Sequence, residues 1–278
     1  MKILTRNFIR LISIGAFDTK DAVEPMSDYK WHKLISIAQT YDVLDFINNG
    51  IAALHNATGT TIPSEIDKAA LREKSISAQN TEQDKTGFDI SAASGKVKAY
   101  SNFYLNRKYN KLVFNEIHSI DTSLDSLVFM NKLTGNINTL LDSGISFRTL
   151  ADLGFYLRKN GDKIDFVKID SWIKSLKIQN ITELIGSCLI LIYKFESDEL
   201  PFIKNTGTKY IEAVSQELEK MLDNPKQYIN NNSNRPKKGI NPISRPSTHP
   251  LRYYSYQPLE TSSRFMANIL KSLSNIDE

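Results

Sequence analysis

The feature that most constrains the fold is a stretch of 137 residues without proline, between Pro63 and Pro201. Within it, apolar residues recur at spacings of three and four, which is the period of one face of an α-helix. Proline is rare inside helices because it removes a backbone donor and clashes with the preceding turn. Two-residue alternation, the pattern of a half-buried strand, is hard to find. The sequence therefore predicts an all-α protein, an irregular bundle of about eight to ten helices.

Several helix boundaries can be predicted from residues that cap helices. Ser146 has the hydroxyl of a good N-cap, and Gly161 suits the end of the same helix. Between them, the residues that share one apolar face are Phe147, Leu150, Ala151, Gly154 and Phe155. Further starts are predicted where a capping residue precedes a periodic apolar run, at Ser64, Thr122, Asp165 and Asn180.

These helices are expected to form one body over residues 1–223. Its parts are N-terminal helices in residues 1–55, polar middle helices in 56–120 and a C-terminal helical block in 121–223. At 278 residues and 41% hydrophobic content, the chain is long enough to bury a real core. A disordered or fibrous protein is therefore not expected.

Residues 224–257 differ from this body, because they hold five of the nine prolines and a cluster of asparagines. Such a composition predicts an extended arm outside the core. Proline suits the first position of a helix, so Pro258 predicts the start of a terminal helix over residues 258–278. That helix is expected to pack back on the body through its apolar run of Leu259, Phe265, Met266, Ile269, Leu270 and Leu273.

The positive charge of the chain is concentrated in the arm. Six Lys or Arg residues and no acid lie between Asp223 and Glu260, and subtracting them from the net charge of +4 leaves −2 for the rest. The candidate anion-binding residues are Lys237, Lys238, Arg245 and Arg252, interleaved with tyrosines that could stack on bases, Tyr228, Tyr253, Tyr254 and Tyr256. The alternative, a solvated loop whose tyrosines pack on the body, is favoured because a nearly neutral body offers no second basic surface.

A single cysteine, Cys188, excludes an internal disulfide and a cysteine-rich zinc site, which fits a reducing compartment. Residues 1–17 predict an amphipathic helix in preference to a signal peptide, because Arg10 interrupts their apolar run. The longest apolar run elsewhere, residues 184–193, is half of the roughly 20 residues that a membrane span needs. We therefore expect a cytoplasmic protein with no membrane segment.

Motifs for metal or cofactor binding are incomplete. Gly95 and Lys96 are followed by valine, so the hydroxyl of a phosphate-binding loop is missing. The four histidines form no zinc-binding pair. Glu116, His118 and Asp121 are close in sequence, but they lie at a predicted helix junction, where capping is the commoner use of such residues. No metal and no cofactor are expected.

The strongest candidate for catalysis is Gly186-Ser187 followed by Glu196 and Asp198. It imitates the glycine-serine turn and paired carboxylates with which nucleotidyltransferases hold a triphosphate and two metal ions. That chemistry needs the carboxylates on a strand, whereas the intervening residues indicate the continuation of a buried helix. We expect coincidence, with Glu196 and Asp198 as weak catalytic candidates.

Two blocks of the chain resemble a known family. The segments NFIRLISIGAF and MSDYKWHKLISIAQTYDVLDFINNGI resemble the N-terminal helices of the uncharacterised nucleotidyltransferase family common in Bacteroidetes. The positions of that family's pattern hold Trp31, Leu34, Ala38 and Val43 in this chain. The segments GISFRTLADLGFYLRKNGDKIDFVKIDSWIKSLKIQNI and DELPF resemble the C-terminal helical region of the same family. The recurrent positions of that region hold Arg148, Asp152, Leu157, Arg158, Asp165 and Pro201 in this chain. Residues 56–116 lack the family's lysine-glycine turn and its aspartate-x-aspartate strand. The resemblance implies a shared helical scaffold without the transferase core, and therefore a pseudoenzyme.

Three functions follow from these observations as hypotheses. The first is a non-catalytic binding or regulatory protein with a protein partner, which predicts an apolar or charged surface groove and no deep acidic pocket. The second is a divergent nucleotidyltransferase that uses Glu196 and Asp198. The third is a binder of nucleic acid or another anionic polymer through the arm, whose affinity would fall steeply with salt.

Overall fold

The computed structural model describes residues 1–55, 62–63, 65–66, 98–204, 207–225, 227–228 and 249–274. Within these ranges the chain forms ten α-helices, three short 3-10 helices and no strand, so the prediction of an all-α fold with eight to ten helices is confirmed. None of the helices in these ranges combines the length and the hydropathy that a bilayer-crossing segment requires.

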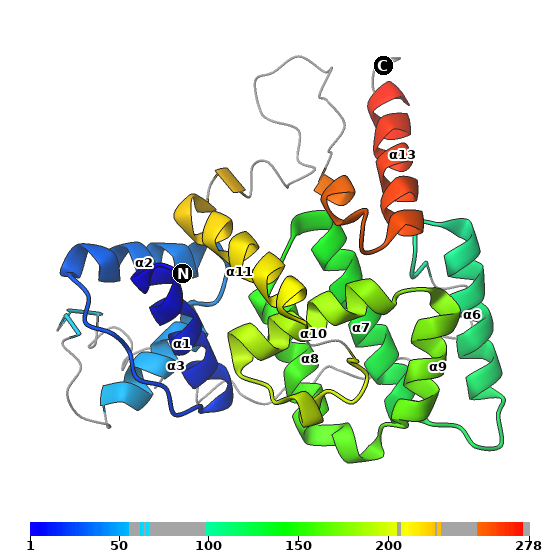
Figure 1. Cartoon of the computed structure of the whole chain (residues 1–278), viewed down its shortest axis with the longest axis horizontal. Coiled ribbons are helices and arrows are strands. Elements are labelled where there is room, and N and C mark those ends of the chain that lie inside the picture. Colours follow the sequence, from blue (N-terminus) through cyan, green and yellow to red (C-terminus); the bar gives the residue numbers. More distant parts are fainter. Residues whose placement is uncertain are drawn as a thin grey trace.

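The first three helices form one end of the molecule (Figure 1). They are α1 (Ile3–Phe17), α2 (Asp28–Thr40) and α3 (Leu44–His55). Helices α1 and α3 cross at two glycines that leave no room for a side chain. A β-carbon on Gly15 would stand 1.7 Å from the carbonyl oxygen of Phe46, and one on Gly50 would stand 2.4 Å from that of Leu11. The backbones of α1 and α3 therefore touch directly.

The remaining helices form the larger part of the molecule, with α6 and α9 at the end away from α1–α3 (Figure 1). The α-helices are α6 (Phe103–Ile117), α7 (Leu124–Ser143), α8 (Phe147–Asn160), α9 (Phe166–Leu176), α10 (Gln179–Tyr193), α11 (Thr208–Asp223) and α13 (Pro258–Ser274). The 3-10 helices are η1 (Gly161–Lys163), η2 (Ser197–Glu199) and η3 (His249–Tyr253). Of the predicted middle helices, the structure describes α6, and most of residues 56–97 lie outside the described ranges.

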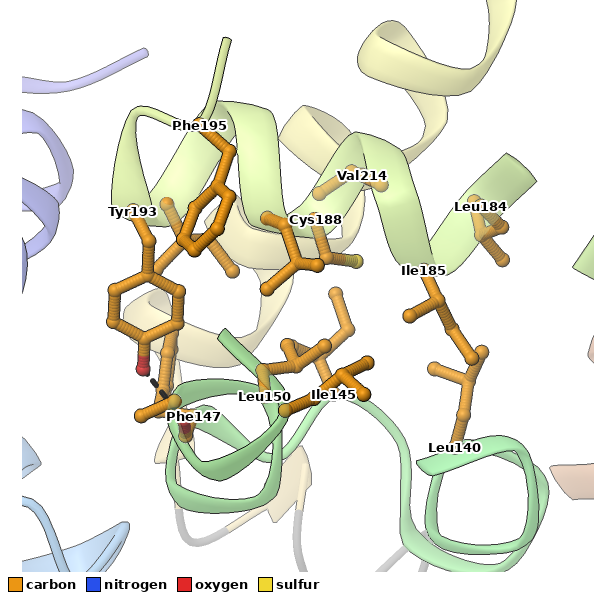
Figure 2. Packing of buried hydrophobic residues seen from close by; sticks show 14 of the residues in the cluster. Leu140, Ile145, Phe147, Leu150, Leu184, Ile185, Cys188, Tyr193, Phe195 and Val214 are labelled. Carbon is orange, nitrogen blue, oxygen red and sulfur yellow. Dashed lines mark hydrogen bonds between the residues drawn. The ribbon is translucent and has the colours of Figure 1, made fainter. Parts of the chain in front are cut away.

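Helix α10 is the centre of the core, because it packs against α1, α7, α8, α9 and α11. Eleven of its fifteen residues are buried, as expected for a helix that is apolar on all sides. Figure 2 shows its side chains meeting those of α7 and α8. At the end of α10, the hydroxyl of Tyr193 donates to the carbonyl of Phe147 at 2.5 Å, which fixes α10 against the start of α8.

Two predicted helix starts and one predicted end are confirmed. The Ser146 side chain accepts from the backbone N–H of Thr149, and α8 ends with Gly161 as its C-cap residue. The Asp165 carboxylate accepts from the backbone N–H groups of Val167 and Lys168 at 3.0 Å each. In each case the capping side chain and its backbone partners are within three residues, so the interaction is local.

Other local predictions were wrong by a residue or by one side chain. The cap of α7 is Ser123, because the hydroxyl of Thr122 instead donates to the carbonyl of Glu116 in α6 and to that of Ser119 just after it. Helix α10 begins at Gln179, so Asn180 lies inside its first turn. Phe155 is 40% exposed because, eight residues after Phe147, it lies about 80° around the helix from that buried residue, on the side away from Leu150 and Gly154. The predicted start at Ser64 lies outside the described residues.

Candidate functional site

The glycine-serine pair and the weak catalytic candidates lie on different elements. Gly186 and Ser187 lie in the middle of α10, where the Ser187 hydroxyl donates to the carbonyl of Glu183 at 2.9 Å. Glu196 and Asp198 are exposed at the surface turn that contains η2. The predicted continuation of a buried helix after Ser187 is confirmed, and it keeps the glycine-serine pair from forming the turn that a triphosphate requires.

Glu116 and Cys188 lie where they contribute to the packing of the helices. The carboxylate of Glu116 accepts from the backbone N–H of Ser123 at 2.8 Å and from the ammonium of Lys168 at 2.9 Å, so it joins α6, α7 and α9. Burial raises the pKa of the Cys188 thiol well above its ordinary value, and the thiolate that a nucleophile needs is disfavoured. The described ranges contain no group of three His, Cys, Asp or Glu side chains that could hold a metal ion.

The structure does contain a pocket, of about 250 Å³, between α7, α10, α11 and η3. Its floor is apolar, and Figure 2 labels four of its members, Leu140, Ile145, Leu184 and Val214. Its other lining residues are Ala213, Gln216, Glu217, Lys220, Arg252, Tyr253 and Tyr256. Residues from the predicted body and from the predicted arm therefore meet in one cavity.

Glu217 is the polar centre of this pocket. One of its oxygens, Oε1, accepts from the hydroxyl of Tyr228 at 2.6 Å and from Nη1 of Arg252 at 2.6 Å. The guanidinium of Arg252 also lies over the Tyr228 ring, 5.7 Å from its centroid. Burial opposes the charge of Arg252, but the Glu217 carboxylate outweighs it, so the pKa of Arg252 is raised above its ordinary value. Arg252 therefore stays charged and lies as a fixed cation beside the carboxylate of Glu217.

A glycine in the turn after α7 makes room for Tyr228. Gly144 has a φ of +91°, which side chains rarely adopt, and a β-carbon there would stand 2.3 Å from the Tyr228 hydroxyl oxygen. The position of this hydroxyl thus depends on Gly144 as well as on Glu217. Burial raises the pKa of Tyr228 far above its ordinary value, so the hydroxyl remains a donor.

The predicted arm is folded at both of its described ends. Tyr228 and Tyr253 are buried, and η3 is a short helix where an extended segment was predicted. The physical reason is that the residues at both ends bond to the same carboxylate, which lies on α11 in the body. Of the four predicted anion-binding residues, Arg252 lies in the pocket, and Lys237, Lys238 and Arg245 lie outside the described residues.

Lys220 is a pocket residue that the sequence did not indicate. It lies in the last turn of α11, three residues after Glu217, and is exposed at the rim. It makes no ion pair with a described residue. A lysine in the last turn is common in helices, because it complements the helix dipole, so its type and position alone gave no signal.

A second feature is the inverted burial of α13. Glu260 is fully buried, and its carboxylate accepts from the backbone N–H groups of Ser101 (2.8 Å) and Asn102 (2.9 Å) and from Nε of Arg264 (2.8 Å). Arg264 is also buried and donates to side chains of α7, those of Asp142 and Asn138. A buried ionic network thus joins the base of α13 to α6 and α7.

Three apolar residues of α13 are turned the other way. Leu259, Met266 and Leu270 are 43%, 54% and 63% exposed, and their spacing of seven and four places them along one stripe. Helix α13 begins at Pro258 as predicted. Of its predicted apolar run, Phe265 and Ile269 are half-buried, and the fully buried residues of the helix are polar, Glu260, Thr261 and Arg264. Figure 1 shows α13 standing out from the other helices.

The start of α6 lies beside α13. The Asn102 side chain donates to the hydroxyl of Ser263, which is on the same face of α13 as Met266. The next two residues, Phe103 and Tyr104, are exposed, Phe103 by 80%. We call these five exposed residues the α13 surface: Leu259, Met266, Leu270, Phe103 and Tyr104.

Positive charge adjoins the α13 surface. Arg107 and Lys111 are exposed on α6 and make no ion pair with a described residue. The ammonium of Lys108 lies 5.1 Å from the centroid of the Tyr104 ring and donates to the carbonyl of Ser175. Helix α6 has no acidic residue before Glu116, whose carboxylate is already paired with Lys168.

No protein-family model, curated protein or solved structure matches this chain.

Proposed function

We propose that this protein is a non-catalytic binding protein that docks a protein partner on the α13 surface. The observation that carries the proposal is the inverted burial of α13, in which Glu260 and Arg264 are buried while Met266 and Leu270 face solvent. Groups of exposed apolar side chains rimmed by polar residues mark interaction sites, because leaving them in water forgoes about 25 cal/mol for each Å² that a partner could cover.

The ionic network supports a binding role because it holds the surface in place before a partner arrives. A buried salt bridge adds little stability compared with apolar residues of the same volume, so its presence is poorly explained by stability. It does fix the direction of α13 through bonds to α6 and α7. A surface that is already ordered loses less conformational entropy on binding.

The partner that fits best is an acidic amphipathic helix. Its apolar face would lie against the α13 surface, in the way that amphipathic helices bind apolar grooves. Its carboxylates would lie near Arg107 and Lys111, which are exposed beside that surface. A basic helix would be disfavoured, because these cations would oppose it.

We also propose that the scaffold is related to the Bacteroidetes nucleotidyltransferase family and lacks its transferase core. Placement of Gly186 and Ser187 inside α10, with Glu196 and Asp198 on a surface turn, supports this pseudoenzyme interpretation. A thermal-shift titration with ATP, CTP, GTP or UTP and Mg²⁺ tests the alternative. A metal-dependent rise in Tm with any nucleotide would contradict the non-catalytic proposal, since a ligand that binds the native state must stabilise it.

The docking proposal is tested with two labelled peptides of about 18 residues, both with leucines at helical spacing, one with glutamates and one with lysines on the other faces. Fluorescence anisotropy should give a Kd for the acidic peptide at least about tenfold below that for the basic one. Met266→Asp combined with Leu270→Asp should weaken acidic-peptide binding by at least about tenfold. The matched control is Val167→Asp, an exposed apolar residue of α9, which should leave it unchanged.

Three results would contradict the docking proposal. Equal binding of the two peptides, or no binding of either, would remove the stated partner chemistry. Concentration-dependent dimerisation in analytical ultracentrifugation that Met266→Asp abolishes would assign the α13 surface to a second copy of the chain. Tighter binding of a single-stranded oligonucleotide than of the acidic peptide, with a steep salt dependence, would favour the anionic-polymer hypothesis.

A further inference from the structure

We propose that the pocket between α7, α10, α11 and η3 binds a small organic carboxylate with an apolar body. This inference goes beyond the proposed docking function, because it concerns different side chains and a different class of ligand. It rests on the size of the pocket, on the division of its lining into apolar and charged parts, and on the balance of its charges.

The pocket has room for a small molecule. Its volume of about 250 Å³ corresponds to roughly eight water molecules at about 30 Å³ each. A carboxylic acid with a short alkyl chain or one aromatic ring fits within this volume.

The floor of the pocket suits an apolar body. Leu140, Ile145, Leu184 and Val214 are buried residues from α7, the turn after it, α10 and α11, and they present carbon atoms to the cavity. The Tyr253 side chain, also buried, adds an aromatic wall. A small inorganic anion such as phosphate would leave this floor uncovered, so the floor favours an organic ligand.

The charges at the pocket favour an anionic group. Glu217 is the one acid among the described residues of the lining, and its Oε1 already accepts from Arg252 and Tyr228. Lys220 at the rim makes no ion pair with a described residue, so these lining residues together carry one positive charge more than negative. A carboxylate at the rim would be attracted to the ammonium of Lys220 and to the guanidinium of Arg252, whereas an amine would be repelled.

The guanidinium of Arg252 is held in place for such a role. Its Nη1 is bound to Glu217 at 2.6 Å and its plane is near the Tyr228 ring, so the group needs little reorganisation when a ligand arrives. Arginine presents five N–H donors, and one bond to Glu217 leaves others available at the pocket. The geometry places this cation next to an apolar floor, which is the arrangement that an amphipathic carboxylate requires.

The experiment uses hexanoate and phenylacetate as probes, with hexanamide, hexylamine and inorganic phosphate for comparison. Protein-observed NMR titrations of the full chain should show shifts at Val214 and Tyr253 that saturate at millimolar concentrations of either carboxylate. The amide should bind at least about tenfold more weakly, because it has no charge for Lys220 and Arg252 to attract. The amine and phosphate should cause no saturable shift at Val214.

Two variants with one matched control locate the site. Lys220→Gln should weaken carboxylate binding by about five- to tenfold, while Lys209→Gln, an exposed lysine in the first turn of the same helix, should leave it unchanged. Ala213→Phe should fill the cavity and abolish the shifts. The proposal is overturned if the folded protein binds neither carboxylate at about 10 mM, if amide and carboxylate bind equally, or if Lys220→Gln has no effect.

Discussion

Gly144 and Tyr228 are in direct contact across 84 residues of sequence, and a β-carbon on the glycine would stand 2.3 Å from the tyrosine hydroxyl oxygen. The same hydroxyl donates to Glu217, so a turn of the body sets the position of a pocket residue. This contact makes the pocket sensitive to a substitution that changes no group lining it.

Gly144→Ala should therefore destabilise the protein by about 3 kcal/mol, through a φ of +91° that alanine rarely adopts and through the clash with Tyr228. Urea denaturation of the variant measures the change. In Tyr228→Phe the clashing oxygen is gone, so the cost of Gly144→Ala should fall by about 1 kcal/mol in that background. Strictly additive costs in the double variant would show that the contact carries no energy.

Replacing glycine by alanine should lower the stability of the fold at the crossing of α1 and α3 and raise it on α7. Gly50→Ala would place a methyl group 2.4 Å from the carbonyl oxygen of Leu11, and overpacking of this kind should cost about 3 kcal/mol. Gly135→Ala on α7 meets nothing within 4 Å and should stabilise by about 0.5–1 kcal/mol, because alanine favours the helix. Thermal or urea unfolding of both variants measures the change in the free energy of unfolding. The same change in both variants would contradict the close crossing of α1 and α3.

Breaking the buried pair at the base of α13 should be costly. Arg264→Met leaves the Glu260 carboxylate buried with two backbone donors and no cation, and should cost about 3–5 kcal/mol in urea denaturation. Hydrogen exchange at the Asn102 amide should speed up in the same variant. Ser262→Ala on the exposed side of α13 is the control, with an expected change below about 0.5 kcal/mol.

Acid should weaken the link between α1 and the segment that follows it. The pKa of Glu24 is lowered from 4.5 to about 2, first by the hydrogen bond from Arg6 and further by that from Arg10. Because the folded pKa is below the unfolded value, this contribution to stability is present above pH 4.5 and is lost as the pH falls toward 2. Stability measured between these pH values should vary less in Glu24→Gln, and an NMR titration of Glu24 with an ordinary midpoint would contradict the ion pair.

Local features of the fold could be predicted because they depend on neighbours in sequence. The caps at Ser146 and Asp165 bond to N–H groups within three residues, and Pro258 starts α13 as a first-turn proline. The apolar run around Cys188 was long and continuous enough to predict a buried helix, which also identified Gly186 and Ser187 as a coincidental match to a motif.

The orientation of α13 and the pocket could not be predicted, since both depend on distant partners. Helical periodicity favours burial of Met266 and Leu270. Burial of Glu260 is favourable because its carboxylate accepts from the backbone N–H groups of Ser101 and Asn102, some 158 residues upstream, as well as from Arg264. Charge clustering did mark Arg252 as an anion-binding candidate. Its pairing with Glu217 follows from how α11 packs on α10, and no local pattern carries that information.

The convergence of Tyr228 and Arg252 on one oxygen of Glu217 has a consequence for how the chain can change in length. The two ends of the intervening segment are held together by contacts to α11, whatever lies between them. For a segment closed in this way, doubling its length raises the entropic cost of closing it by only about 0.6 kcal/mol. Insertions, deletions or an inserted domain between Tyr228 and Arg252 should therefore be tolerated, with the helical body and its pocket unchanged.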